Sequence, residues 1–205
     1  MNAVLYKVGG VSFIVGSIFF FPRFGAYEDV GAWIFFTGSL LYLVVTGHDM
    51  AEVIRYRKAL TRRMRAENLE AIAATAYLLG TVLFAIGSIF FLSEVGLFVA
   101  GAWLFIIGSA LFTLGACVNV VQIVKAHSML ILQLMNLTAI AFVVGSVLFL
   151  VASVPYLWHV ENTADRTTLY AFLAWQYLIG SILFLLGAIF NYWRVRIVMK
   201  QAVGR

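Results

Sequence analysis

Long, nearly uninterrupted apolar runs dominate the chain, and short polar segments separate them. A run of about 20 apolar residues is long enough to cross a membrane, because an α-helix rises about 1.5 Å per residue and the hydrocarbon core is about 30 Å thick. The runs lack the alternation of apolar and polar positions that a barrel strand needs. The pattern predicts an all-α polytopic membrane protein, a single membrane domain over residues 1–205. Its six transmembrane helices are expected at 4–22, 30–47, 71–93, 95–118, 132–154 and 169–192.

The composition supports this prediction. The 205 residues are 63% hydrophobic and only 11% charged, whereas a soluble domain is about 45–50% apolar and about 25% charged. A soluble core of this size does not need so many apolar side chains, so the excess is expected to face lipid. With only two prolines, the chain is suited to long helices.

Positive charge is unevenly distributed over the segments between the predicted spans. Only Arg23 and Arg166 lie on one side of the predicted membrane. The other twelve basic residues lie on the side of the termini: Lys7, Arg55, Arg57, Lys58, Arg62, Arg63, Arg65, Lys125, Arg194, Arg196, Lys200 and Arg205. The positive-inside rule then predicts cytoplasmic N- and C-termini. The net charge of +5 reflects this topology, so we expect no nucleic-acid partner.

An internal repeat divides the chain into three stretches, 6–55, 71–125 and 135–198. Each stretch contains one Gly-Ser pair in its first predicted helix and a second pair, five residues after a tryptophan, in its second helix. The paired residues are Gly16, Ser17, Gly38, Ser39, Gly87, Ser88, Gly108, Ser109, Gly145, Ser146, Gly180 and Ser181, and the tryptophans are Trp33, Trp103 and Trp175. Agreement in residue type and spacing predicts three parallel two-helix hairpins. Both a pseudo-threefold arrangement and a less symmetric bundle fit this pattern.

The glycines of the repeat recur at intervals of seven residues, as in Gly101, Gly108 and Gly115. A seven-residue period keeps one stripe of a helix facing its partner, and small residues let membrane helices approach closely. We therefore interpret the Gly-Ser pairs as helix-packing residues, although a pore lined by glycine and serine is the alternative. The three repeat tryptophans are expected to anchor the helices at the membrane interface.

The repeated motif resembles the YrhK-like domain of small bacterial membrane proteins. The resemblance is clearest at 87–112, where Gly87-Ser88 is followed by Gly101-Ala102-Trp103 and Gly108-Ser109. Residues 16–42 are similar, and residues 145–184 are similar more loosely, because Leu173 replaces a glycine. The resemblance implies a multi-pass protein of the bacterial inner membrane. It implies no catalytic residues.

Few residues suggest chemistry. No ionisable residue lies deep in a predicted span, which argues against proton relays, haem and catalysis. We therefore expect no catalytic residue, no cofactor and no metal site, and we interpret His48, Asp49 and Glu52 as a solvated helix end. Asp49, Asn119 and Asn191 each lie eleven residues after a repeat glycine. They either cap helices, bond across the bundle, or form a polar ring around an axis.

The segment 48–70 is the most distinctive polar stretch. Its apolar residues recur at helical spacing, and the polar positions hold six basic and four acidic residues. The basic residues are Arg55, Arg57, Lys58, Arg62, Arg63 and Arg65. We interpret this segment as a basic amphipathic connector near the membrane surface. It either sets the topology and contacts lipid nonspecifically, or it binds a specific anionic lipid or a partner protein.

Together these features favour a noncatalytic membrane protein, either a scaffold, an accessory subunit or a small homo-oligomer. The expected partners are the lipid bilayer, another copy of the chain or another membrane protein. The alternative function is a channel or facilitator for a small neutral or lipid-like solute. These functions differ in what the bundle axis contains, because a channel needs a path and a scaffold does not.

Overall fold

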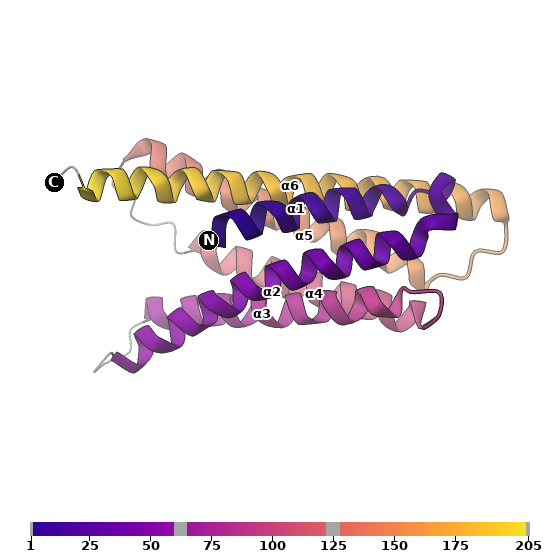
Figure 1. Ribbon diagram of the computed structural model, residues 1–205, viewed down its shortest axis with the longest axis horizontal. Helices are drawn as coiled ribbons and strands as arrows, with labels where there is room; N and C mark the ends of the chain where they lie inside the picture. Colours follow the sequence, from indigo (N-terminus) through magenta and orange to yellow (C-terminus); the bar gives the residue numbers. More distant parts are fainter. Residues whose placement is uncertain (1, 60–64, 122–127, 204–205) are drawn as a thin grey trace.

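The computed structural model describes residues 2–59, 65–121 and 128–203, and every regular element in these residues is helical. The predicted all-α class is therefore confirmed. Six α-helices lie along the long axis of the molecule, with both termini toward the same end (Figure 1). The elements are α1 (Asn2–Phe19), η1 (Pro22–Tyr27), α2 (Glu28–Ala59), α3 (Arg65–Phe90), α4 (Phe98–Val121), α5 (Met129–Ser153), η2 (Val154–Leu157) and α6 (Thr163–Val203).

Five helices, α2 to α6, are long and apolar enough to cross a membrane, by length and composition. The corresponding stretches are, in chain order, Pro22–Ala59, Glu67–Phe90, Phe98–Val121, Met129–Leu157 and Thr163–Gln201. The helix that carries the first predicted span has a shorter apolar stretch, Val4–Phe19. It ends at Phe19 because Pro22 disfavours helical geometry in the residue before it, and Phe21 is extended, with φ −68° and ψ 137°.

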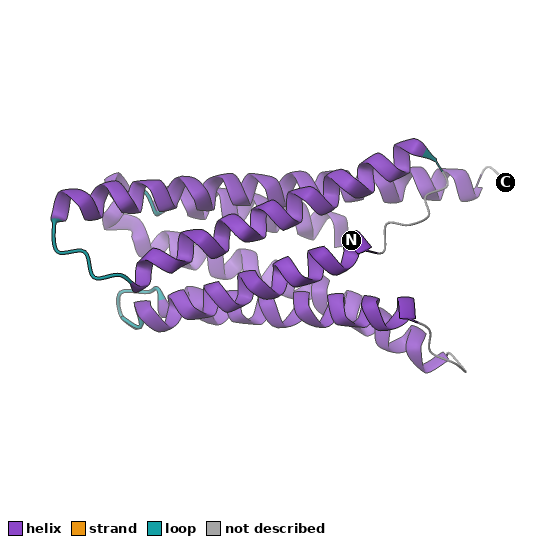
Figure 2. Ribbon diagram, turned by 180° about the vertical axis from the view of Figure 1, so that it is seen from behind, coloured by secondary structure: helices purple, strands orange, loops and turns teal. Residues whose placement is uncertain are grey.

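The α-helices form a closed ring. Among the described residues, each α-helix packs against two other α-helices: α1 on α2, α2 on α3, α3 on α4, α4 on α5, α5 on α6, and α6 on α1. The connections within the three hairpins lie at the end opposite the termini, where Figure 2 shows loops in teal. The 3-10 helices η1 and η2 belong to the first and third connections. The ring therefore has a termini end and a loop end, and its axis runs between them.

Glycines bring the two helices of each hairpin into backbone contact. In each hairpin, a glycine of the first helix faces the backbone carbonyl oxygen of a glycine in the second helix, and a methyl group added at the first glycine would meet that oxygen. The pairs are Gly9 and Gly38, Gly80 and Gly108, and Gly145 and Gly180, at 3.3, 3.0 and 3.1 Å. Such distances are tighter than ordinary contacts, so a side chain at these positions would push the helices apart.

These contacts differ from the predicted alignment of the third hairpin. The repeated Gly-Ser motif aligns Gly145 with Gly16 and Gly87. In the structure, however, Gly145 makes the contacts that Gly9 and Gly80 make in the other two hairpins. The third hairpin is thus offset by seven residues, which places Ala152 where Gly16 lies. The sequence is ambiguous here, because small residues seven apart occupy the same stripe of a helix.

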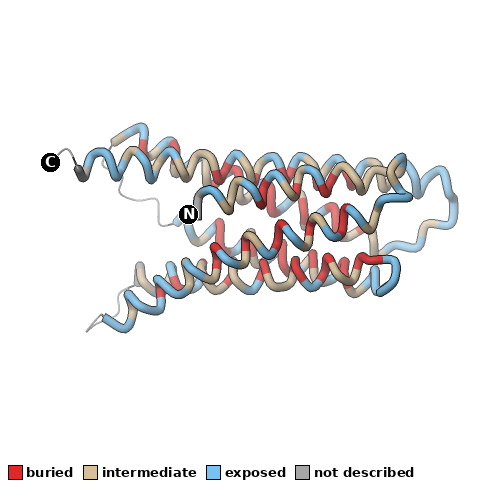
Figure 3. The backbone as a smooth tube through the Cα atoms, viewed as in Figure 1, coloured by how far each residue is buried: buried red, intermediate tan, exposed pale blue. Residues whose placement is uncertain are grey.

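Aromatic side chains fill the space enclosed by the six helices, and we call this group of side chains the aromatic column. The ring centroids of Phe35, Phe105 and Tyr177 form a nearly equilateral triangle, 6.2, 6.3 and 6.3 Å apart. The surrounding rings are Phe13, Phe84 and Phe149 on one side and Phe20, Phe91 and Tyr156 on the other. Figure 3 shows that buried residues follow the inner faces of the helices. The axis is therefore a packed core in this structure.

The basic connector is not a separate element. Residues 48–59 continue α2, and α3 begins at Arg65. No proline interrupts residues 48–59, and Ala51, Glu52, Arg55 and Lys58 favour helix. Arg62 and Arg63 lie outside the described residues, as does part of the predicted second repeat, 122–125.

Candidate functional site

A pocket opens at the termini end of the ring, and we call it the axial pocket. It has a volume of about 420 Å³, and side chains from all six α-helices line it. The polar lining residues are Tyr6, Tyr42, Asp49, Glu70, Tyr77, Asn119, Thr138, Asn191 and Arg194, and the apolar ones are Phe112, Ala116, Met135, Ala139, Phe142 and Ala188. Because every helix contributes, the pocket lies around the axis.

The three polar residues that follow the repeat glycines meet in this pocket. Asp49 comes from α2, Asn119 from α4 and Asn191 from α6, so alternate helices of the ring supply them. Asn119 donates a hydrogen bond to the Tyr77 hydroxyl at 3.2 Å, and Arg194 donates one to the Asn191 amide oxygen at 2.8 Å. Of the roles considered from sequence, a bond between helices of the bundle and a polar ring around an axis both fit this placement.

Charges of opposite sign lie on different sides of the pocket. Asp49 and Glu70 are carried by α2 and α3, which are neighbours, whereas Arg194 is carried by α6. In the ring, α6 packs against α1 and α5 and lies across from α3. The pocket therefore has an acidic side and a basic side, separated by the axis.

Tyr42 and Phe112 form the floor of the axial pocket. Both also line a small void of about 10 Å³ on the other side, which Phe13, Phe84 and Phe149 of the aromatic column line as well. The residue at the equivalent position in α6 is Phe184. The ring centroids of Phe184 and Phe149 lie 5.2 Å apart, and so do those of Tyr42 and Phe13. The packing thus accepts phenylalanine at this level, and only Tyr42 adds a hydroxyl.

The Tyr42 hydroxyl is buried and has no hydrogen-bond partner among the described residues. Tyr177 shows the contrasting case, because its buried hydroxyl lies 2.8 Å from the Ser153 hydroxyl. Buried polar groups are normally paired, so an unpaired one needs an explanation.

All twelve residues of the Gly-Ser pairs are buried in the structure. Ser17, Ser88, Ser146 and Ser181 each donate a hydrogen bond to the carbonyl oxygen four residues earlier, at 2.7 to 2.8 Å. Ser17 also lies 3.1 Å from the Ser181 hydroxyl, a contact between α1 and α6. The hydroxyls of Ser39 and Ser109 are buried without a partner in the described part of the chain.

The repeat tryptophans lie on the outside of the bundle. Trp33, Trp103 and Trp175 are 52, 51 and 55% exposed. Their nearly equal exposure reflects equivalent positions in α2, α4 and α6, each two residues before a ring of the central triangle.

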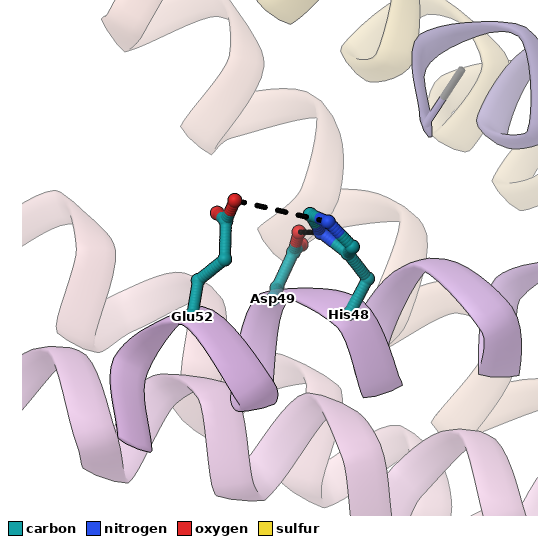
Figure 4. A group of neighbouring side chains, drawn as sticks. All are labelled: His48, Asp49 and Glu52. Atoms are coloured by element: carbon teal, nitrogen blue, oxygen red, sulfur yellow. Dashed lines mark ion pairs between the residues drawn. The ribbon is translucent and has the colours of Figure 1, made fainter. Parts of the chain in front are cut away.

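His48, Asp49 and Glu52 lie together on α2 (Figure 4). The two imidazole nitrogens of His48 lie 3.8 Å from carboxylate oxygens of Asp49 and Glu52. All three side chains come from one helix and are about half exposed to solvent, an arrangement in which ion pairs contribute little to stability.

A second hollow lies on the outer surface between α2, α3 and α4, and we call it the lateral groove. Its volume is about 460 Å³. Arg57 and Asn68 lie at its polar end, joined by a 3.3 Å hydrogen bond, and Ile72, Leu79 and Leu114 line its apolar part. Of the predicted lipid-contact residues, Arg57 lines this groove; Arg55 and Lys58 are exposed on the same helix, and the side chain of Arg65 is not described.

Comparison with known families identifies the chain. The model of the family described as "YrhK-like protein" matches residues 1–54 and 67–124. The chain belongs to the YrhK-like family. The two matched stretches contain one hairpin each, α1–α2 and α3–α4. No curated protein and no solved structure matches the chain.

Sequence reasoning missed the aromatic column and most of the axial pocket in this YrhK-like protein. One signal was present, because Phe35, Phe105 and Tyr177 each stand two residues after a repeat tryptophan. Glu70 and Arg194 had no such signal, because they are not repeated residues.

Proposed function

We propose that this YrhK-like protein is a noncatalytic integral membrane protein, a scaffold or accessory subunit built from three hairpin repeats around a pseudo-threefold axis. The observation that carries the proposal is the aromatic column. Phe35, Phe105 and Tyr177 are at most 1% exposed and occupy the centre of the ring, where a channel would need a path. The alternative function is a channel or facilitator for a small neutral or lipid-like solute.

A flux measurement tests this proposal. The purified protein is reconstituted into liposomes, and swelling in glycerol or urea is compared with swelling of protein-free liposomes. We expect equal rates, because the packed rings leave no room for a solute. A faster, protein-dependent rate would contradict the proposal and support the channel. Native mass spectrometry of gently extracted protein then separates an accessory subunit, which carries a second polypeptide, from a homo-oligomer.

We also propose that all six helices cross the bacterial inner membrane and that both termini are cytoplasmic. Both termini lie at one end of the ring (Figure 1), and most basic residues belong to that end. The exposed repeat tryptophans lie toward the loop end and suit the outer interface. A reporter fused after Arg205 should read cytoplasmic, and one inserted near Arg166 should read periplasmic. The reverse pattern would overturn the orientation.

The lateral groove supports the expected contact with anionic lipids. Arg57 offers a positive charge for a phosphate, while Ile72, Leu79 and Leu114 offer an apolar surface for an acyl chain. Arg57→Gln should reduce retention of phosphatidylglycerol relative to phosphatidylcholine in native mass spectra. Arg55→Gln is the matched control, because Arg55 lies on the same helix outside the groove. Equal losses in both variants would indicate nonspecific charge attraction instead.

A further inference from the structure

The axial pocket has the dimensions of a ligand site. Its volume of about 420 Å³ falls within the ~300–1,000 Å³ range of small-molecule pockets, which combine an apolar lining with a few polar groups. Phe112, Met135 and Phe142 supply apolar wall, and three phenol groups and two amides supply polar atoms. A pocket of this composition suits a molecule with an apolar body and a polar end.

An unpaired group marks the floor of this pocket. The Tyr42 hydroxyl is buried without a hydrogen-bond partner among the described residues, although the equivalent positions 112 and 184 hold phenylalanine. It belongs to a cluster, because the Tyr6 ring packs edge-on against the Tyr42 ring, with ring centroids 4.8 Å apart, and Tyr77 lines the same pocket. A buried hydroxyl that has given up water without gaining a partner is unfavourable. A polar atom of a bound molecule would satisfy it.

The charged lining residues indicate the kind of polar end. Arg194 is half-buried and forms no ion pair within the described part of the chain, its hydrogen bond being to the neutral Asn191. Asp49 and Glu70 face it from α2 and α3 across the ring. A carboxylate pairs well with a guanidinium, and an ammonium pairs well with carboxylates. One molecule that carries both groups would match both sides of the pocket.

We propose that the axial pocket binds a small zwitterion of the amino-acid class, with an ammonium group, a carboxylate and an apolar side chain. The carboxylate binds Arg194, the ammonium group binds the side of Asp49 and Glu70, and a polar atom reaches the Tyr42 hydroxyl. The apolar side chain packs against Phe112 and Phe142. Because the molecule has no net charge, the basic residues of the termini end neither attract nor repel it as a whole.

The experiment uses the full-length protein in lipid nanodiscs and isothermal titration calorimetry. Three probes share a phenyl body: L-phenylalanine carries both charges, phenethylamine only the ammonium group, and 3-phenylpropionate only the carboxylate. We expect saturable binding of phenylalanine, and at least about 10-fold weaker binding of both other probes, because each loses a charge-assisted contact. Equal binding of all three, tighter binding of a singly charged probe, or no saturable binding of phenylalanine would overturn the proposal. So would a pocket that retains only phospholipid through purification.

Variants assign the two sides of the pocket. Arg194→Gln should bring the affinity for phenylalanine down to that for phenethylamine, and Glu70→Gln should bring it toward that for 3-phenylpropionate. Arg196→Gln is the matched control, since Arg196 is exposed on the same helix outside the pocket. Tyr42→Phe should weaken phenylalanine binding and raise the unfolding temperature of the ligand-free protein. Unchanged phenylalanine affinity in folded Arg194→Gln and Tyr42→Phe protein would contradict the assignment.

Discussion

Gly145 and Gly180 hold the backbones of α5 and α6 against each other. A methyl group added at Gly145 would lie 3.1 Å from the carbonyl oxygen of Gly180, and one added at Gly180 would lie 3.1 Å from that of Gly145. The same reciprocal contact joins Gly80 and Gly108, at 3.0 and 3.2 Å. Because the obstacle is backbone rather than a flexible side chain, the helices must separate to accept any larger residue.

Gly180→Ala should therefore destabilise the protein. Overpacking of this kind costs about 1–3 kcal/mol, and the added methyl group would also press on the Phe149 ring, whose nearest atom lies at 2.7 Å. Thermal unfolding in detergent measures the change. Gly47→Ala is the matched control, because no atom lies within 4 Å of its added methyl group. It should be neutral or raise stability by about 0.5–1 kcal/mol, as alanine favours helix. Equal effects of both changes would contradict this account of the glycines.

Phe105→Ala should open the aromatic column. The ring centroid of Phe105 lies 4.8 Å from that of Phe84 and 5.1 Å from that of Phe91. Phe105 is also one corner of the triangle that it forms with Phe35 and Tyr177. Loss of a fully buried phenylalanine ring costs about 3–5 kcal/mol. Ile107→Ala is the control, because Ile107 lies two residues away and is 46% exposed on the outer face.

The same pair of variants tests how the axis is closed. If the aromatic column blocks passage, folded Phe105→Ala protein should swell liposomes faster than wild-type or Ile107→Ala protein. If its swelling rate stays at that of wild-type protein, the remaining rings close the axis without Phe105. A rate above background in wild-type protein would instead contradict the blocked axis.

Ser17→Ala and Ser39→Ala should differ in sign, although both hydroxyls are fully buried. Ser17→Ala removes the contact with Ser181 between α1 and α6, and such contacts between membrane helices contribute about 0.6 kcal/mol on average. Ser39→Ala removes a hydroxyl that has no partner among the described residues, so stability should hold or rise by about 1 kcal/mol. Chemical unfolding in mixed micelles measures both. A larger loss for Ser39→Ala would contradict the assignment.

A pH-dependent contact ties α2 to the loop between α3 and α4. Asp29, which precedes the apolar stretch 30–47, accepts hydrogen bonds from the backbone N–H of Ser93 at 2.8 Å and from the Ser93 hydroxyl. These bonds favour the ionised carboxylate and lower the pKa of Asp29 below its ordinary value.

The sign of the effect follows from the lowered pKa. The contact stabilises the folded protein fully above the ordinary aspartate pKa, and this stabilisation is lost as the pH falls through the lowered pKa. The unfolding temperature of wild-type protein should therefore drop more on acidification than that of Ser93→Ala protein. Parallel curves would show that the contact contributes nothing measurable. Asp29→Asn, which keeps the shape without the charge, provides the control.

The sequence was sufficient to predict the all-helical class and six helices, because apolar run length is a local signal. It was not sufficient for the register of the third hairpin. Gly145 and Ala152 are seven residues apart on the same helix stripe, so either aligns with Gly16. Only the contact of Gly145 with Gly180 distinguishes the two alignments.

The site was predictable in part for a similar reason. Asp49, Asn119 and Asn191 share a place in the repeat, and a ring of polar residues follows from that place once the hairpins surround an axis. Glu70 and Arg194 lie opposite each other only because α3 and α6 are opposite in the ring. The order of helices around an axis depends on packing between hairpins, which no local pattern contains.

Because α1 packs against α6, the ring of helices is closed, and the same ring could be formed whichever hairpin comes first in the chain. A linker from Val203 to Asn2, with new termini in the segment 122–127 between α4 and α5, would leave every neighbour relation of the ring intact. Circular permutation of this chain should therefore preserve its fold. By the same geometry, a shorter chain with a single hairpin would complete an equivalent ring by self-association of three copies.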